Sequence, residues 1–245
     1  MKIKLTLTYD GTDFCGWQRQ KKGVSVQETV EDALFKITGE KIKIVGSGRT
    51  DAGVHALGQV ASFSSSGGIP PEKYAKALNT VLPAGVKAVK SERAEDNFDA
   101  CRSAKIKTYR YSAYISDTVL PLKDRYATMV TDYPEIDFSK IESAAKLLVG
   151  THDFKAFCAS GNSSKTTVRT IYDLKAEKKG ADIDFTVTGN GFLYNMVRII
   201  AGVLIAVGRG EFSEDDVKKM LETGVRPMNV KTLSPKGLCL LKVEY

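Results

Sequence analysis

The 245-residue sequence has few of the residues that build metal centres or disulfide scaffolds. Its two histidines, His55 and His152, have no ligand-like spacing to each other or to a cysteine. Its four cysteines are scattered with no short paired spacing, which suits neither a zinc ribbon nor a disulfide framework. We therefore expect neither a metal site nor a disulfide scaffold.

The sequence also lacks the glycine-rich motifs that bind nucleotide cofactors. It contains no phosphate-binding P-loop and no dinucleotide fingerprint after a strand. A Cys-His or Ser-His-Asp catalytic arrangement stays open, although no local pattern supports one. We expect an enzyme of this composition to work without a cofactor.

Long apolar segments are missing as well. The longest run, residues 192–207, is too short to cross a bilayer comfortably and contains Arg198. Residues 1–6 lack the apolar core of a signal peptide. These features predict a cytoplasmic protein with no membrane association.

The charge balance points to a polyanionic partner. The chain has 36 Lys and Arg against 29 Asp and Glu, a formal net charge of +7. A positive surplus concentrates a polyanion near the surface and speeds its arrival. It favours a nucleic acid as partner, although a merely basic soluble protein would have the same composition.

Hydrophobic periodicity predicts an α+β protein with two similar halves, residues 1–105 and 106–245. The first half has the order β-α-β-β-α-β of the ferredoxin-like or RRM-like fold. Its expected elements are strands at 2–9, 42–45, 57–63 and 86–89, a helix that starts at the Ser25 cap and ends at Gly39, and a helix that follows Pro70-Pro71 and runs to about Leu82. The second half repeats this theme loosely. Its expected elements are strands at 107–115, 168–177, 182–188 and 238–243, helices at 138–149 and 192–207, and a short surface helix capped at Ser213. If the halves lie side by side, their sheets could join, and the cleft between them would be the natural substrate site.

The loop at residues 46–55 is the best candidate for chemistry. Glycines at 46, 48 and 53 permit unusual backbone angles and a close approach by a ligand. Asp51 lies two residues after Arg49, and an adjacent cation keeps a carboxylate ionised, as a nucleophile must be. An ordinary hairpin loop, in which Asp51 only binds local amides, remains the alternative.

Arg198 stands out because the surrounding helix is apolar on every face and should be buried. A desolvated, unpaired charge costs at least several kcal/mol, so Arg198 needs an anion. A carboxylate in a cleft would supply it. Arg198 could instead line an RNA-facing wall or cap backbone carbonyls.

The strand at 107–111 interleaves aromatic and basic side chains. Alternation places Tyr109 and Tyr111 on one face. Aromatic rings beside cations suit unstacked RNA bases and their phosphates, but tyrosines are also common core residues of strands. Both interpretations remain open.

Six stretches of the sequence together resemble the tRNA pseudouridine synthase A family. The signature-like stretch is GRTDAGVHALGQV at 48–60. The supporting stretches are YDGTDFCGWQRQ (9–20), FDACRSAKIKTYRY (98–111), GTHDFKAFCASG (150–161), GNGFLYNMVRIIAG (189–202) and GLCLLKVEY (237–245). Because they follow the family's order along the whole chain, the resemblance is specific.

The resemblance implies roles for five residues. Asp51 matches the catalytic aspartate, Tyr109 the tyrosine that stacks on the target base, and Arg198 the basic residue paired with the aspartate. Arg49 matches an arginine expected to help hold the flipped nucleotide. Leu238 matches an apolar position beside the nucleoside.

The resemblance also implies an architecture and a substrate. The fold would be two α/β halves whose antiparallel sheets join into one, with a central active-site cleft. The protein would be a homodimer in which one tRNA contacts both subunits. It would modify uridines on the 3′ side of the anticodon stem-loop, at positions 38–40, without a cofactor.

Four basic residues are plausible phosphate contacts: Arg19, Lys21, Lys22 and Arg102. Arg102 departs from the family pattern, since the family commonly has the arginine one place earlier, where this chain has Cys101. In a strand this shift would move the arginine to the opposite face.

Two rival functions remain at this stage. A non-catalytic RNA-binding protein would share the basic and aromatic character. An N-glycoside hydrolase would release free uracil, and that chemistry usually recruits a second carboxylate or a placed water. Asp10, Asp13 and Asp153 are candidates for that carboxylate only because they are acidic.

Overall fold

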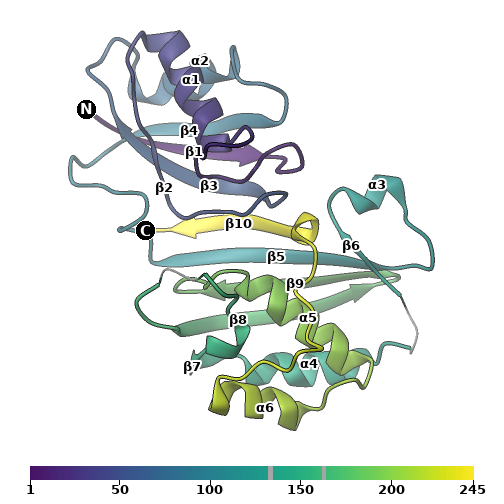
Figure 1. The fold of residues 1–245 in the computed structure, drawn as a ribbon. Coiled ribbons are helices and arrows are strands. Elements are labelled where there is room, and N and C mark those ends of the chain that lie inside the picture. The colour runs from purple at the N-terminus through teal and green to yellow at the C-terminus, as the bar shows by residue number, and fades with distance from the viewer. Residues whose placement is uncertain (132–134, 162–163) are drawn as a thin grey trace. The chain divides into compact units, whose positions relative to one another are not determined.

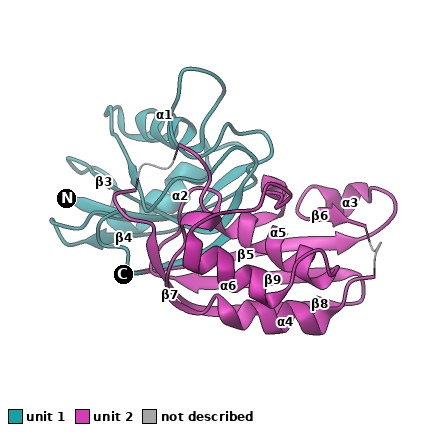
Figure 2. Ribbon diagram, turned by 60° about the horizontal axis from the view of Figure 1, so that its bottom comes forward, with its two compact units in different colours: residues 1–105, 239–245 teal, residues 106–238 magenta. Residues whose placement is uncertain are grey.

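The computed structural model describes residues 1–131, 135–161 and 164–245. Two compact units divide the chain (Figure 2): unit 1 comprises residues 1–105 and 239–245, and unit 2 comprises residues 106–238. The expected halves, residues 1–105 and 106–245, stay a prediction; in the structure, residues 239–245 group with unit 1.

Unit 1 is a sheet with two helices (Figure 1). Its elements are β1 (Lys2–Tyr9), α1 (Val26–Thr38), β2 (Val45–Gly46), β3 (His55–Ser64), a 3-10 turn (Pro71–Lys73), α2 (Tyr74–Asn79), β4 (Val86–Ala94) and, from Cys239 onward, β10 (Leu238–Glu244). The strand order is β4-β1-β3-β10, and β2 pairs with β3. Both β4 and β3 run antiparallel to β1, whereas β10 runs parallel to β3.

Helix α1 begins and ends where its capping residues predict. Ser25 Oγ accepts a hydrogen bond from the Glu28 amide at 3.2 Å, and Gly39 ends the helix with φ of 73°. The buried side of α1 includes Val30 and Leu34, which are fully inaccessible to solvent. These two hydrophobic side chains anchor α1 in the core of unit 1.

The strand predicted at 42–45 is wrong in most of its length, since β2 contains only Val45 and Gly46. Ile42 and Ile44 are buried alternately, as in a strand. However, the Ile44 amide donates to the Glu31 carboxylate at 3.1 Å instead of to a neighbouring strand. A side chain therefore takes the place of a ladder partner, which periodicity cannot reveal.

Unit 2 combines five strands with helices and short irregular segments among the described residues. Its elements are β5 (Ile106–Ile115), α3 (Pro121–Asp124), β6 (Thr128–Val130), α4 (Phe138–Leu147), β7 (Gly150–Asp153), a 3-10 turn (Lys155–Phe157), β8 (Val168–Lys179), β9 (Asp182–Gly189), α5 (Met196–Gly208), α6 (Glu214–Thr223) and a 3-10 turn (Pro235–Gly237). The strand order is β5-β9-β8-β7, all antiparallel, and β6 pairs parallel with β5. Helix α5 contacts α4, which also contacts β8 (Figure 1).

Helix α5 is the buried helix that the apolar run predicts, but it starts later, at Met196 instead of Phe192. Asn195 precedes it in the left-handed region, with φ of 61°. Asparagine tolerates that conformation better than most residues. Every residue of α5 except Arg198 is buried.

The observed elements confirm the predicted α+β class, with mostly antiparallel strands and six α-helices among the described residues. Three short elements, α3, β6 and β7, were not predicted. Each has only three or four residues, too few for a hydrophobic period to emerge.

Candidate active site

The loop between β2 and β3 presents Asp51 on a tight turn. The Val54 amide donates to the Asp51 carbonyl at 3.1 Å, and Gly53 has φ of 78°. A positive φ at this third position is the signature of a type II turn, which glycine favours. The Asp51 side chain is half-buried and Arg49 is exposed. The carboxylate thus lies on a shaped loop in which only glycine fits easily at position 53.

The segment before α1 supports this turn from one side. The Trp17 amide donates to the Thr50 carbonyl at 3.0 Å, and the Gln27 amide donates to the Trp17 carbonyl at 3.0 Å. A Cβ at Gly46 would lie 2.4 Å from two atoms of the Trp17 indole. Trp17 is almost fully buried. The glycine at 46 therefore makes room for the tryptophan that fixes the loop.

Buried polar side chains of β1 and β3 form hydrogen bonds with the loop. Tyr9 Oη and Thr50 Oγ1 are 2.8 Å apart, and Gln59 Nε2 donates to the Gly48 carbonyl at 3.1 Å. Ser47 Oγ donates to Gln59 Oε1 at 2.6 Å. Burial raises the pKa of the Tyr9 phenol above its usual range, so the hydroxyl stays protonated. These bonds fix the backbone on both sides of Arg49.

His55 has a structural position beside the same loop. Its Nδ1 accepts a hydrogen bond from the Gly11 amide at 3.0 Å and lies 3.2 Å from Asp10 Oδ1. A Cβ at Gly11 would lie 2.0 Å from the Val54 carbonyl oxygen, so only glycine permits this approach. The contact ties the chain after β1 to the start of β3.

Tyr9, Trp17 and Gln59 are supporting residues that the sequence reasoning did not single out. All three occur within the stretches that carry the family resemblance, at 9–20 and 48–60. A search of those stretches for large buried or amide side chains could have found them. These three residues become neighbours only when the strands pair, and the spacing of residues along the sequence does not reveal that pairing.

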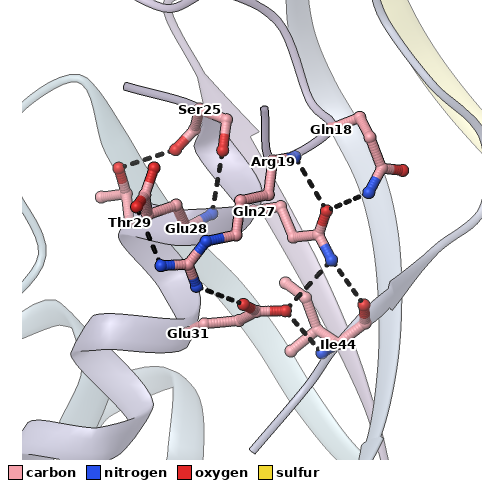
Figure 3. A network of polar contacts seen from close by, with 8 residues as sticks. All are labelled: Gln18, Arg19, Ser25, Gln27, Glu28, Thr29, Glu31 and Ile44. Atoms are coloured by element: carbon pink, nitrogen blue, oxygen red, sulfur yellow. Dashed lines mark hydrogen bonds and ion pairs between the residues drawn. The ribbon is translucent and has the colours of Figure 1, made fainter. Parts of the chain in front are cut away.

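Arg19 belongs to a polar network at the start of α1 (Figure 3). Its guanidinium binds Glu28 at 3.0 Å and Glu31 at 3.3 Å. Gln27 Oε1 accepts from the Arg19 amide at 3.0 Å, and Gln27 Nε2 donates to Glu31 at 3.0 Å. Glu31 also accepts from the Ile44 amide. The network connects α1 with the segments on both sides of it, and a phosphate at Arg19 would compete with two carboxylates.

The other three proposed phosphate contacts are exposed. Lys21 and Lys22 lie in the loop before α1, and in the described part of the chain neither forms an ion pair. Arg102 lies in a turn at 100–103, not in a strand, so the alternation of side chains along a strand does not decide which way it points. Asp99 Oδ1 accepts from the Arg102 amide at 2.9 Å.

In unit 2, Tyr109 and Tyr111 differ in environment. Tyr109 is 8% exposed and meets Phe192 edge to face, with ring centroids 5.2 Å apart. Tyr111 is fully buried, and its hydroxyl lies 2.6 Å from Thr128 Oγ1 and donates to the Ser234 carbonyl at 2.8 Å. Tyr111 is therefore a core residue, whereas Tyr109 retains a small exposed fraction.

Arg198 is half-buried on α5 and binds neighbours in its own unit. Its Nε donates to the Leu233 carbonyl at 2.7 Å, and its Nη1 donates to Asn195 Oδ1 at 2.6 Å. Arg198 thus binds a backbone carbonyl, as one of the alternatives from the sequence expected. Leu238, the first residue of β10, is buried. Pairing of Arg198 with Asp51 stays a prediction, because the two residues belong to different units.

The described part of the chain contains neither a membrane-spanning helix nor a metal-binding cluster. None of the helices in residues 1–131, 135–161 and 164–245 has the length and apolar character that a membrane span requires. Within the same residues, no group of three or more His, Cys, Asp or Glu side chains is arranged to hold a metal ion.

Comparisons with known proteins identify close relatives. A family model described as tRNA pseudouridine synthase matches residues 6–101 and 144–245. The tRNA pseudouridine synthase A of Thermoanaerobacter sp. (strain X514) is 44% identical over 243 residues, covering 99% of both chains. That of Acetivibrio thermocellus is 43% identical over 243 residues with the same coverage.

A chain in a solved Cbf5-Nop10-Gar1 complex is also similar, at 14% identity and a TM-score of 0.39. The likeness covers 97% of this chain and 48% of that chain. A TM-score this low supports no further argument.

Proposed function

This chain belongs to the tRNA pseudouridine synthase family and is an isomerase of tRNA uridine, and we propose that Asp51 is its catalytic carboxylate. We further propose that its targets lie on the 3′ side of the anticodon stem-loop, at positions 38–40. The observation that carries the assignment of Asp51 is the type II turn, which presents a half-buried carboxylate on a firmly supported loop.

The reaction sets clear demands on such a site. The bond from C1′ to N1 of uridine breaks, the uracil turns, and a bond from C1′ to C5 forms. N1 gains a proton and C5 loses one, so atoms and electrons balance without an oxidant or a reductant. The target base must leave the helical stack, which costs a few kcal/mol and requires a pocket that compensates.

Asp51 is suited to meet the electron deficiency that develops at the sugar or the base. Arg49 is its near neighbour in the loop and is proposed to help hold the flipped nucleotide. The bonds from Thr50 to Tyr9 and Trp17 would keep the carboxylate in place while the uracil turns. Precise placement of a reacting group is worth orders of magnitude in rate.

Three residues outside the loop are proposed to complete the site. Tyr109 would stack on the target base through the face of its ring, and Leu238 would lie beside the nucleoside. Arg198 would supply the positive charge that keeps Asp51 ionised, since an opposite charge nearby lowers the pKa of a carboxylate. The hydrogen bonds to Leu233 and Asn195 would hold the guanidinium of Arg198 in one position for this role.

The wider setting is also a proposal. Lys21, Lys22 and Arg102 are exposed cations that suit contacts with tRNA phosphates. We propose a homodimer in which one tRNA contacts both subunits, acting in the cytoplasm.

The decisive experiment is nucleoside analysis of unmodified tRNA after incubation with wild type, Asp51→Asn and Asp32→Asn. Asp32 is an exposed residue of α1, so its variant is the control with the same change of charge. Wild type and Asp32→Asn should form pseudouridine, whereas Asp51→Asn should bind tRNA normally and form none.

Each rival has its own product. A non-catalytic RNA-binding protein would leave the nucleosides unchanged with every variant, and an N-glycoside hydrolase would release free uracil. Pseudouridine from Asp51→Asn at the wild-type rate would remove Asp51 from the mechanism while leaving the reaction intact.

A further inference from the structure

A groove of about 590 Å³ lies in unit 1, and no residue of the loop at 46–55 lines it. Its walls are the end of β4 and the segment at 95–105, and Tyr245 closes one side. This volume falls within the range of roughly 300–1,000 Å³ that is typical of ligand sites. The groove is therefore large enough to receive part of a bound molecule.

Two aromatic rings and a lysine lie together in the lining of the groove. The rings of Phe98 and Tyr245 have centroids 4.9 Å apart. Lys4 Nζ lies 4.7 Å from the centroid of Tyr245 and 5.8 Å from that of Phe98. Lys4 occupies the half-exposed register of β1, whose alternate residues are buried. Its ammonium is thus held over the aromatic pair by cation–π attraction.

Hydrogen bonds fix the wall at 95–105 to the sheet. The Ala100 amide donates to Ser62 Oγ at 3.1 Å, and Tyr245 Oη donates to the Ala100 carbonyl at 3.0 Å. The Lys105 amide donates to the Glu244 carbonyl at 2.9 Å. Burial raises the pKa of the Tyr245 phenol, which keeps its hydroxyl a donor. The wall is therefore preorganised and not a loose loop.

The charges of the groove are unbalanced. Glu92 is engaged by Lys90 at 2.6 Å and by Lys4 at 3.5 Å. Arg93, Arg102 and Lys105 are exposed, and in the described part of the chain none of the three has a carboxylate within ion-pair distance. The groove is thus lined by the cations Lys4, Arg93, Arg102 and Lys105 and by the carboxylates Glu92 and Glu95. Asp99, whose carboxylate accepts from the Arg102 amide, lies next to this lining.

We propose that this groove binds the phosphate backbone of the tRNA substrate, as a contact separate from the catalytic loop. The inference rests on the proposed function, because it takes tRNA as the substrate. Arg102 and Lys105 on the fixed wall would neutralise adjacent phosphates, with Arg93 opposite on β4. Arginine and lysine are the usual phosphate contacts, and a preorganised wall lowers the entropy cost of binding.

The test measures tRNA affinity as a function of monovalent salt for the full-length protein. The logarithm of the association constant falls linearly with the logarithm of the salt concentration. Each lost phosphate contact makes this slope shallower by about 0.9, the value for duplex DNA, or by about 0.7, the value for single strands. Arg102→Gln with Lys105→Gln should therefore reduce the slope by about 1.4 to 1.8. The control is Lys73→Gln with Lys76→Gln, two exposed lysines at the start of α2 that lie outside the groove. Its slope should equal that of wild type.

The proposal would be overturned if the groove variant had the same slope as the control. That result would mean that the groove either binds nothing or binds another partner, such as an acidic protein surface. Arg102→Lys keeps the charge and should retain the slope. If the double variant no longer unfolds cooperatively, Arg93→Gln alone should lower the slope by about 0.7 to 0.9. Failure of the proposed function is seen separately, as wild-type protein that binds tRNA and forms no pseudouridine.

Discussion

Replacing Arg19 with Met separates a structural role of this residue from a role in RNA binding. In the structure, its guanidinium binds Glu28 and Glu31, whose side chains are 28% and 10% exposed, while its own side chain is 52% exposed. Ion pairs with an exposed member contribute about 0.2–1 kcal/mol each. We therefore expect Arg19→Met to lower the free energy of unfolding by about 1 kcal/mol for both pairs together.

Two assays on the same variant measure the two roles. With a urea slope of about 2 kcal/mol/M, the loss corresponds to a midpoint lower by about 0.5 M. The salt dependence of tRNA binding should stay at the wild-type slope, because Arg19 is already occupied by carboxylates. Lys36→Met is the control, since it removes an exposed cation from the last turn of the same helix.

The reverse pattern would refute this reasoning. A slope lower by about 0.9 with an unchanged urea midpoint would make Arg19 a phosphate contact that abandons Glu28 and Glu31 when tRNA binds. A lower midpoint for Lys36→Met as well would show that the measured loss reflects charge on α1 in general.

Two further predictions concern the support of the loop at 46–55. Gly46→Ala should shift the emission of Trp17, the one tryptophan in the sequence, and destabilise the protein by about 1–3 kcal/mol, since the new Cβ would lie 2.4 Å from the indole. Gly85→Ala, whose Cβ would meet Phe14 at 3.3 Å, should leave that emission unchanged, and an unshifted emission for Gly46→Ala would contradict the contact. Because burial raises the pKa of Tyr9, its contribution to stability is complete below about pH 10 and is lost as pH rises beyond that value. Unfolding free energies between pH 9 and 11.5 should therefore fall less steeply for Tyr9→Phe than for wild type, and parallel curves would refute the assignment.

Elements with strong local signals could be predicted from the sequence. Ser25 and Gly39 mark both ends of α1, and Ser213 and Asp216 form the capping box that begins α6. The start of α5 was predicted four residues early, because an apolar run does not show that Asn195 adopts a left-handed conformation. Here the backbone of one residue, not the hydrophobic pattern, determines the boundary.

The candidate site was predicted in part. Glycines 46, 48 and 53 mark the loop as a candidate, but their spacing also fits an ordinary hairpin, and the family resemblance is what assigns Asp51. The partners of the loop, Tyr9 and Gln59, come from strands β1 and β3, so they are neighbours only after the sheet has formed. Likewise, the positive charge of Arg19 alone suggests a phosphate contact. Its carboxylate partners are evident only once the position of α1 is known.

The position of β10 has a consequence for how the chain is made. Cys239 and Leu240 pair with His55 and Ala56, yet all of unit 2 lies between these partners in the chain. Contacts of such large sequence separation form slowly, because a long loop must close before they contribute. During synthesis from the N-terminus, the first strands leave the ribosome while the edge of β3 that receives β10 is still uncovered. A chaperone that shields exposed strand edges would act on this intermediate, and the start of β3 at His55 would gain its pairing with β10 only after unit 2 has been synthesised.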